Sequence, residues 1–265
     1  MFRSVMNTVI NSSYKGSSLD AVDKGLSFNG DNFRLDAGSE ATLGGVFTSG
    51  AGSIVMWIKP SSDGENDDGT IISKGTWSLK TTSQISSLMK LKFTHNYATT
   101  NGVWEQSHYT PSLTSTGYRH LVLSFDASSG DLNMYIDGYA DLGPDGTNQM
   151  AETSTPSGLA SSDATSRMAI GAENLLGTDC FHGEISDLAI YKQAFTHDEA
   201  IELENGGLLY DHLAGDFNTS LKAWWRMGDG PEGEEGNIIY DMSSYGHDAT
   251  GNGNEYVDGI HGREN

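Results

Sequence analysis

The sequence predicts an all-β protein, an antiparallel β-sandwich with one short helix near residues 197–205. Apolar segments are short, and many alternate with polar residues at the period of a half-buried strand. The 265 residues include 33 glycines and only 5 prolines, and Gly, Ser, Thr, Asn and Asp gather between the apolar segments, as turn residues do. A hydrophobic content of 36% is enough to fill one large core.

The first strands follow residue 25. The segment "GLSFNGDNFRLDAG" alternates around the dipeptide Asn29-Gly30, which is typical of a tight hairpin turn. In "GSIVMWIKP", residues 52–60, apolar side chains occupy both faces of the predicted strand. We therefore expect this strand to lie between two packed layers, with Trp57 in the core.

The clearest unit is "YRHLVLSFDASSGDLNMYIDGYAD", residues 118–141. Apolar residues alternate along its first half, "DASSGD" reverses the chain, and a second alternating strand returns, which predicts an antiparallel pair. Further strands are predicted in residues 69–82, 88–99, 167–173 and 183–193.

One segment carries helix signals. In "FTHDEAIELENGG", Thr196 stands three residues before Glu199, the spacing of a capping box. Apolar residues follow at helical spacing, and Gly206 is suited to end the helix.

Composition excludes several classes of partner. The formal net charge of −21 argues against nucleic acid, which requires a basic surface, and against charge-driven docking on anionic membranes. We find no 18-residue apolar run and no basic and apolar leader in "MFRSVMNTVINSSYKGSS", so we expect neither a membrane span nor a secretory signal. The single cysteine, Cys180, rules out a disulfide within the chain.

The order of these units resembles the laminin-G-like, concanavalin A-like lectin/glucanase family. The resemblance covers about residues 26–204. Its most specific parts are the hairpin "HLVLSFD…LNMYIDG" and the strand-to-helix ending "GEISDLAIYKQAFTHDEA". It implies a jelly roll formed by residues 26–265, preceded by an arm or anchor in residues 1–25.

Residues 221–253, "LKAWWRMGDGPEGEEGNIIYDMSSYGHDATGNG", resemble the Trp-rich strand and turn with which modules of this family open. Here they follow the module, and about 45 residues are too few for a second sandwich of ~100. We expect them to fold back as a completing strand and turns, with Trp224 and Trp225 on opposite strand faces. A truncated second module and completion of a neighbouring subunit's sheet stay open.

The resemblance includes glucanases, which carry alternate carboxylates on one strand. Here Glu184 and Asp187 are three residues apart, so on a regular strand they would face opposite sides. A glycosidase needs both carboxylates at the same sugar. The sequence also has no nucleophile elbow. We therefore expect no enzymatic activity and no catalytic residues.

An acidic loop is a candidate calcium site. "SSDGENDDGT" places Asp63, Glu65 and Asp67 at alternate positions ahead of Gly69. The loop is not an EF-hand, because the twelfth position from Asp63 is Lys74 instead of glutamate. Some modules of the resembled family hold calcium in rim loops, but a solvated acidic loop is the alternative interpretation.

A sugar site requires exposed aromatic rings beside polar groups. The segment "FTHNYATTNGVWEQSHYT" supplies a concentration of them, and the alternative is that they pack on the sheet face. The candidate carbohydrate-binding residues are His95, Tyr97, Trp104, His108 and Tyr109.

The expected function is that of a bacteriophage virion protein, a decoration or appendage of the head, neck or tail that binds glycans on host or environmental surfaces. The family resemblance together with the missing leader leads to this hypothesis. The protein would then be made in the host cytoplasm, contact other virion proteins through its N-terminal arm and form a homo-oligomer. The alternative is a free-standing extracellular lectin without catalytic activity.

Overall fold

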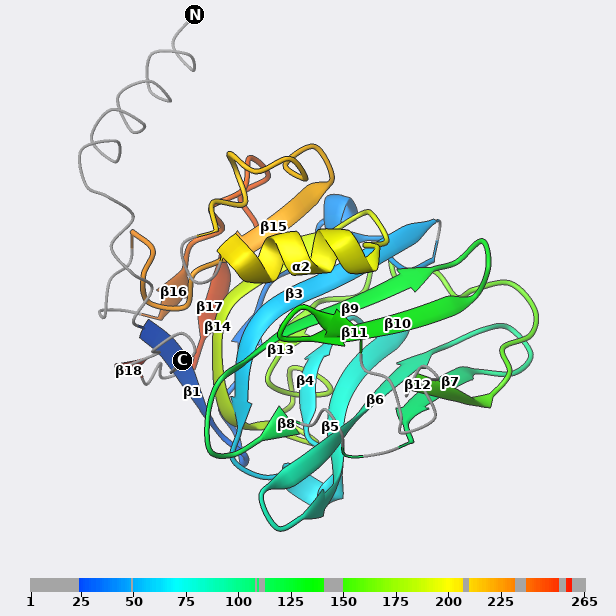
Figure 1. Cartoon of the computed structure of the whole chain (residues 1–265), viewed down its shortest axis with the longest axis horizontal. Helices are drawn as coiled ribbons and strands as arrows, with labels where there is room; N and C mark the ends of the chain where they lie inside the picture. Colours follow the sequence, from blue (N-terminus) through cyan, green and yellow to red (C-terminus); the bar gives the residue numbers. More distant parts are fainter. Residues whose placement is uncertain are drawn as a thin grey trace, which may run out of the picture.

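The computed structural model describes residues 24–48, 50–107, 109, 113–140, 150–206, 210–231, 237–252 and 256–258. They form two antiparallel sheets packed face to face, with one α-helix on the outside (Figure 1). The predicted all-β sandwich is confirmed. In the described residues no helix has the length and apolar character needed to span a bilayer.

We call the eight-stranded layer sheet A. Its spatial order is β11-β10-β9-β3-β14-β1-β18, with β15 also paired to β14. The strands are β1 (Lys24–Asn29), β3 (Ala51–Pro60), β9 (Arg119–Asp126), β10 (Asp131–Ile136), β11 (Tyr139–Ala140), β14 (His182–Tyr191), β15 (Leu221–Trp225) and β18 (Tyr256–Asp258).

We call the ten-stranded layer sheet B. Its order is β12-β7-β6-β5-β4-β13-β2-β17-β16, with β8 paired to β6. The strands are β2 (Leu35–Asp36), β4 (Thr70–Ser73), β5 (Trp77–Ile85), β6 (Leu88–His95), β7 (Gly102–Gln106), β8 (Leu113–Thr114), β12 (Met150–Ser154), β13 (Ala169–Ile170), β16 (Ile238–Ile239) and β17 (Ala249–Gly251). Short 3₁₀ turns occur at Ala41–Leu43 and Glu65–Asp67. The hairpin predicted at Asn29-Gly30 is wrong, because the chain crosses there from β1 in sheet A to β2 in sheet B and the two strands do not pair.

The main core lies between the two sheets. Strand β3 shows how it is built, because Ile54, Met56 and Ile58 point into this core while Val55 belongs to a second cluster on the outer face of sheet A. Both faces of β3 are therefore buried, as its sequence predicts, and Trp57 is 6% exposed.

The second cluster lies between sheet A and helix α2 (His197–Gly206), which crosses the outer face of that sheet (Figure 1). The predicted capping box is present. The backbone N–H of Thr196 donates to Glu199 Oε2 at 2.7 Å, and the N–H of Glu199 reaches Thr196 Oγ1 at 3.4 Å. Leu203 of α2 is buried against the sheet.

The expectation that Glu184 and Asp187 face opposite sides of a strand is wrong. The register of β14 against β3 shifts between Ser186 and Ala189, and Asp187 has a positive φ of 49°. A β-bulge of this kind adds one residue and moves the alternation by one position. Asp187 therefore points to the outer face of sheet A, where it accepts the indole N–H of Trp224 at 2.5 Å.

The C-terminal segment adds strands to both sheets. β15 pairs with β14, β17 pairs with β2 in sheet B, and β18 pairs with β1 in sheet A. Trp225 is fully buried in the main core, where its indole N–H donates to the His247 carbonyl at 2.8 Å. Trp224 packs in the second cluster, so the two rings lie on opposite faces of sheet A.

The expected N-terminal arm comprised residues 1–25. Lys24 and Gly25 already belong to β1, where Lys24 pairs with Asp258 and Gly25 with Val257. Residues 1–23 lie outside the described residues, so an arm in that part of the chain stays a prediction.

Candidate functional site

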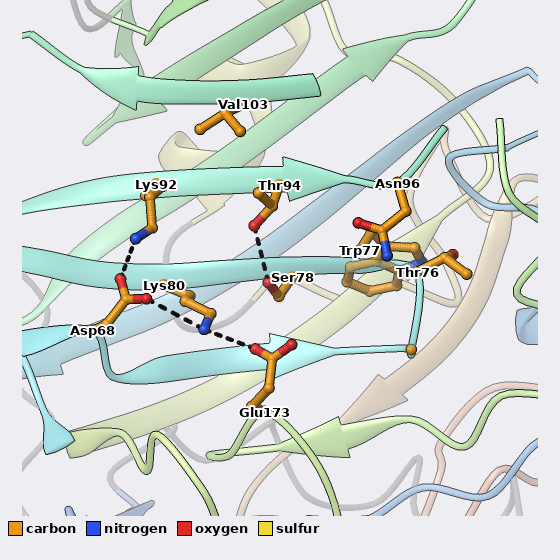
Figure 2. A pocket seen from close by; sticks show the side chains of 11 residues that line it. Asp68, Thr76, Trp77, Ser78, Lys80, Lys92, Thr94, Asn96, Val103 and Glu173 are labelled. Atoms are coloured by element: carbon orange, nitrogen blue, oxygen red, sulfur yellow. Dashed lines mark hydrogen bonds and ion pairs between the residues drawn. The ribbon is translucent and has the colours of Figure 1, made fainter. Parts of the chain in front are cut away.

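A hollow of about 320 Å³ opens on the outer face of sheet B (Figure 2). We call it the groove. Strands β5 and β6 form its base, β7 borders one side, and the loop after β13 borders the other. Its lining residues are Asp68, Gly75, Thr76, Trp77, Ser78, Lys80, Lys92, Thr94, Asn96, Val103 and Glu173.

Strand alternation presents polar side chains to the groove. In β5, Leu79 belongs to the core, so Ser78 and Lys80 on either side of it point outward. In β6, Phe93 faces inward, and Lys92 and Thr94 face outward in the same way. The Ser78 and Thr94 hydroxyl oxygens, on paired residues, lie 3.1 Å apart.

Lys80 is the electrostatic centre of the groove. The register places it directly opposite Lys92, a like-charge pair that would repel. Asp68 lies between them, with one carboxylate oxygen on each ammonium group (Figure 2). Burial lowers the pKa of Lys80, but the hydrogen bond and charge of Glu173, followed by the charge of Asp68, outweigh burial and raise it.

The groove floor is anchored by a buried hydrogen-bond network. The Trp77 indole N–H donates to Asp163 Oδ2 at 3.0 Å, and the N–H of Gly45 donates to Asp163 Oδ1 at 2.7 Å. Fully buried Lys74 donates to the Asp163 carbonyl at 3.0 Å. Burial lowers the pKa of Lys74 more than the charge of Asp163 raises it. These contacts hold the base of the groove in one arrangement.

Two of the predicted sugar-binding residues are misplaced for that role. His95 and Trp104 are 0% and 2% exposed and pack with Phe93 and Phe125, so neither ring is open for stacking. Both residues face inward on their strands, which the aromatic-rich composition of the segment does not reveal. Burial lowers the pKa of His95 to about 4, against a smaller raising effect of Asp163.

The other three candidates do not join one site. Tyr97 is half-buried with its ring against His95, and Tyr109 donates its hydroxyl to the Ser83 carbonyl at 2.6 Å. Neither lines the groove. His108 lies outside the described residues.

The predicted calcium-binding carboxylates perform different structural tasks. Asp63 Oδ2 accepts the N–H of Gln84 at 2.8 Å, and Glu65 Oε2 accepts the N–H of Cys180 at 3.1 Å. Asp67 is exposed. Across the described ranges, no three His, Cys, Asp or Glu side chains gather where they could hold a metal ion. A calcium site at Asp63, Glu65 and Asp67 stays a prediction.

A second, smaller hollow of about 200 Å³ lies on the same face of sheet B, where β2 meets β17. Arg34 and Asn252 border it, but both are engaged in holding the loops together. The Arg34 guanidinium donates to the Leu175 carbonyl at 2.8 Å, and the Asn252 amide donates to the Asn32 carbonyl at 3.0 Å. The larger groove is therefore the better candidate site.

The model of the family described as the Concanavalin A-like lectin/glucanases superfamily matches residues 30–200. The chain belongs to this superfamily. The match begins in the turn after β1 and ends within α2, so the superfamily model includes all the groove residues.

Several solved structures are similar to this chain. A candidate carbohydrate binding protein from Bacteroides ovatus is 19% identical, with a TM-score of 0.59 over 90% of this chain and 60% of that chain. Tailspike protein 2 of the Escherichia coli O157:H7 bacteriophage CAB120 is 11% identical, with a TM-score of 0.46 over 82% of this chain and 31% of that chain. The heptameric SAP-like pentraxin of Limulus polyphemus is 15% identical, with a TM-score of 0.45 over 70% and 83% of the two chains.

The chain thus spans 60% of the length of the Bacteroides ovatus protein. No functionally curated protein matches the sequence.

Sequence reasoning missed the residues that line the groove of this concanavalin A-like sandwich. A signal for some of them was present, because "MKLKFTH" alternates apolar core residues with Lys90, Lys92 and Thr94 on the other strand face. A polar face of this kind also fits an ordinary solvated strand. Glu173 reaches the groove from a loop, so no strand period points to it.

Proposed function

We propose that this protein is a non-catalytic carbohydrate-binding module and that the groove on sheet B holds a short saccharide. The observation that carries the proposal is the chemistry of the lining. Hydroxyl groups of β5 and β6, with amide and carboxylate groups from the loops beside them, line one hollow (Figure 2). Such groups match the donors and acceptors of sugar hydroxyls.

Two further facts support the proposal. The volume of about 320 Å³ is at the low end of small-molecule sites, which run from roughly 300 to 1,000 Å³, and is suited to a short saccharide. The Bacteroides ovatus protein with the same fold is itself a candidate carbohydrate binding protein. Because Trp77 is only 3% exposed, we expect hydrogen bonds to contribute more than ring stacking.

Replacing Asn96 with alanine tests the groove directly. The half-buried Asn96 side chain lines the groove at one end, and its amide offers both a donor and an acceptor. We expect Asn96→Ala to weaken glycan binding about tenfold, because one lost hydrogen bond is worth about 1.4 kcal/mol. Binding is measured by glycan array and then by calorimetry with the best ligand.

The matched control is Thr250→Ala. Thr250 is an exposed polar residue on the same sheet face, but it borders the second hollow instead of the groove. We expect this variant to bind glycans like the unaltered protein. Equal effects of the two substitutions, or no glycan bound by the unaltered protein, would contradict the proposed site.

The groove does not favour glycoside hydrolysis. A glycosidase uses one carboxyl group as acid and a second as base or nucleophile on a shared substrate. In the groove, Asp68 and Glu173 both pair with Lys80, so neither is free for these roles. Glu184 lies on the other sheet, where it contacts Tyr118 and Lys59.

We therefore expect no release of reducing sugar when purified protein is incubated with each polysaccharide that it binds. The assay compares the unaltered protein with Glu173→Gln and Glu184→Gln over several hours. Reducing-sugar release that either substitution abolishes would show that the module is catalytic.

A place in a bacteriophage virion stays part of the proposal. It is carried over from the sequence-based hypothesis, and residues 1–23 of the predicted arm, which would contact other virion proteins, are outside the described part of the chain. A free extracellular lectin is the alternative location for the same groove. Homo-oligomer formation is likewise a prediction, to be tested by light scattering of the purified protein.

A further inference from the structure

We propose that the groove selects neutral glycans over carboxylated or sulfated ones, and that Glu173 is the residue that sets this selectivity. The inference rests on the proposed function, since it names the class of glycan that the same groove accepts. Three features of the groove carry it: the occupied donors of Lys80, a surplus of carboxylates, and the exposure of Glu173.

The first feature is that Lys80 has no donor left for a ligand. An ammonium group has three N–H donors. The Lys80 Nζ lies 2.9 Å from Glu173 Oε2, 3.3 Å from Asp68 Oδ2 and 3.3 Å from Asp179 Oδ2. Its side chain is only 9% exposed. An anionic sugar therefore cannot gain an ion pair with Lys80 unless one of these carboxylates is displaced.

The second feature is the balance of charge. Two ammonium groups, on Lys80 and Lys92, share the three carboxylates of Asp68, Glu173 and Asp179, which leaves one negative charge. Glu105 of β7, directly opposite Lys92, and Lys90, two residues along β6, add one carboxylate and one ammonium group to the same face, so the surplus stays at one negative charge. The whole chain has a formal net charge of −21, so the electrostatic potential from charges outside the groove is also negative.

The third feature is that the Glu173 carboxylate is more open to a ligand than either lysine of the groove. The Glu173 side chain is 37% exposed, against 23% for Lys92 and 9% for Lys80. A carboxylate oxygen only accepts hydrogen bonds, so it matches the hydroxyl donors of a neutral sugar. A second carboxylate or a sulfate placed beside it has no donor to offer and meets a like charge.

The test uses pairs of immobilised glycans that differ by one acidic group, such as lactose and sialyllactose, and glucans with and without sulfate. We expect the unaltered protein to bind the neutral member at least tenfold more tightly. The preference should persist in 1 M NaCl, where the screening length falls to about 3 Å and the field of distant charges is removed.

The variant Glu173→Gln keeps the side-chain shape and removes its charge. We expect it to bind the acidic member of each pair about tenfold more tightly than the unaltered protein does, and the neutral member more weakly, because a charged acceptor of sugar hydroxyls is lost. The control is Asp131→Asn, which removes one charge from an exposed position at the start of β10 in sheet A. It should leave both members of each pair unchanged.

The outcomes separate this inference from the function on which it rests. If the unaltered protein binds acidic glycans as tightly as neutral ones, the selectivity is overturned and glycan binding stands. If Glu173→Gln acts no differently from Asp131→Asn, the role of Glu173 is overturned. If the unaltered protein binds no glycan of either kind, both the proposed function and this inference are wrong.

Discussion

Removing the chain beyond Gly206 is expected to abolish cooperative folding. The deletion takes away β15, which pairs with Leu188–Tyr191 of β14, and β17, which pairs with β2 in the other sheet. It also opens the main core where the fully buried Trp225 lies. Because a domain of this kind is stable by only about 5–15 kcal/mol, losing strands from both sheets exceeds what it can tolerate. Circular dichroism and thermal unfolding of the truncated chain measure the loss.

The single substitution Trp225→Ala tests the contribution of the C-terminal segment to stability with a smaller change. We expect it to lower the free energy of unfolding by about 3–5 kcal/mol, as for other fully buried tryptophans. The control is Leu176→Ala, because Leu176 is 88% exposed and its loss should cost less than about 0.5 kcal/mol. A truncated protein with an unchanged melting temperature would mean that the segment is an appendage outside the sandwich.

Acidification from pH 7 to pH 4 is expected to lower the free energy of unfolding by about 6 kcal/mol through two buried histidines. Burial lowers the pKa of His95 to about 4. Burial and the nearby His212 lower the pKa of His120 to about 3, although Asp187 acts in the opposite direction. In the unfolded chain both titrate near 6.5, so below that pH the unfolded state binds more protons than the folded state.

Above about pH 6.5 both rings are neutral in the folded and the unfolded chain, and they do not lower stability. As the pH falls from there toward the pKa values of the folded chain, the free energy of unfolding decreases. Below the unfolded pKa each further pH step costs about 1.4 kcal/mol per ring, so between pH 7 and pH 4 each ring accounts for about 3 kcal/mol. Urea unfolding between pH 4 and pH 8 measures it, and His95→Phe, which has no ionisable ring, should remove about half of the slope. An identical pH dependence in His95→Phe would contradict the assignment. Burial also lowers the pKa of His247, which acts in the same direction.

The fold could be predicted because its signals are local. Alternation fixes which residues of β9 and β10 face the core, and the Thr196–Glu199 capping box defines the start of α2. The sheet face to which a side chain points is less predictable where the alternation along a strand is interrupted. The bulge at Asp187 reverses the face expected from counting, and no residue type in "GEISDLAIY" announces it.

The groove could not be predicted because its members come together only through the register of the sheet. Asp68, Lys80 and Glu173 are separated by up to about 100 residues in the chain and meet on one face. The aromatic segment suggested a sugar site, yet strand alternation directs His95 and Trp104 into the core. Composition identifies which residue types are present, whereas tertiary pairing decides which of them reach the surface.

The pairing of β1 with β18 makes this sandwich well suited to insertion into another protein. Lys24 lies directly opposite Asp258 in an antiparallel ladder, so the points where the described fold begins and ends are separated by about 5 Å. A loop of a carrier protein can accept a domain with such closely spaced ends without being stretched. The groove is on the opposite sheet and would remain open. This geometry makes the module a practical graft for placing the groove, proposed here to bind glycans, on a scaffold of choice.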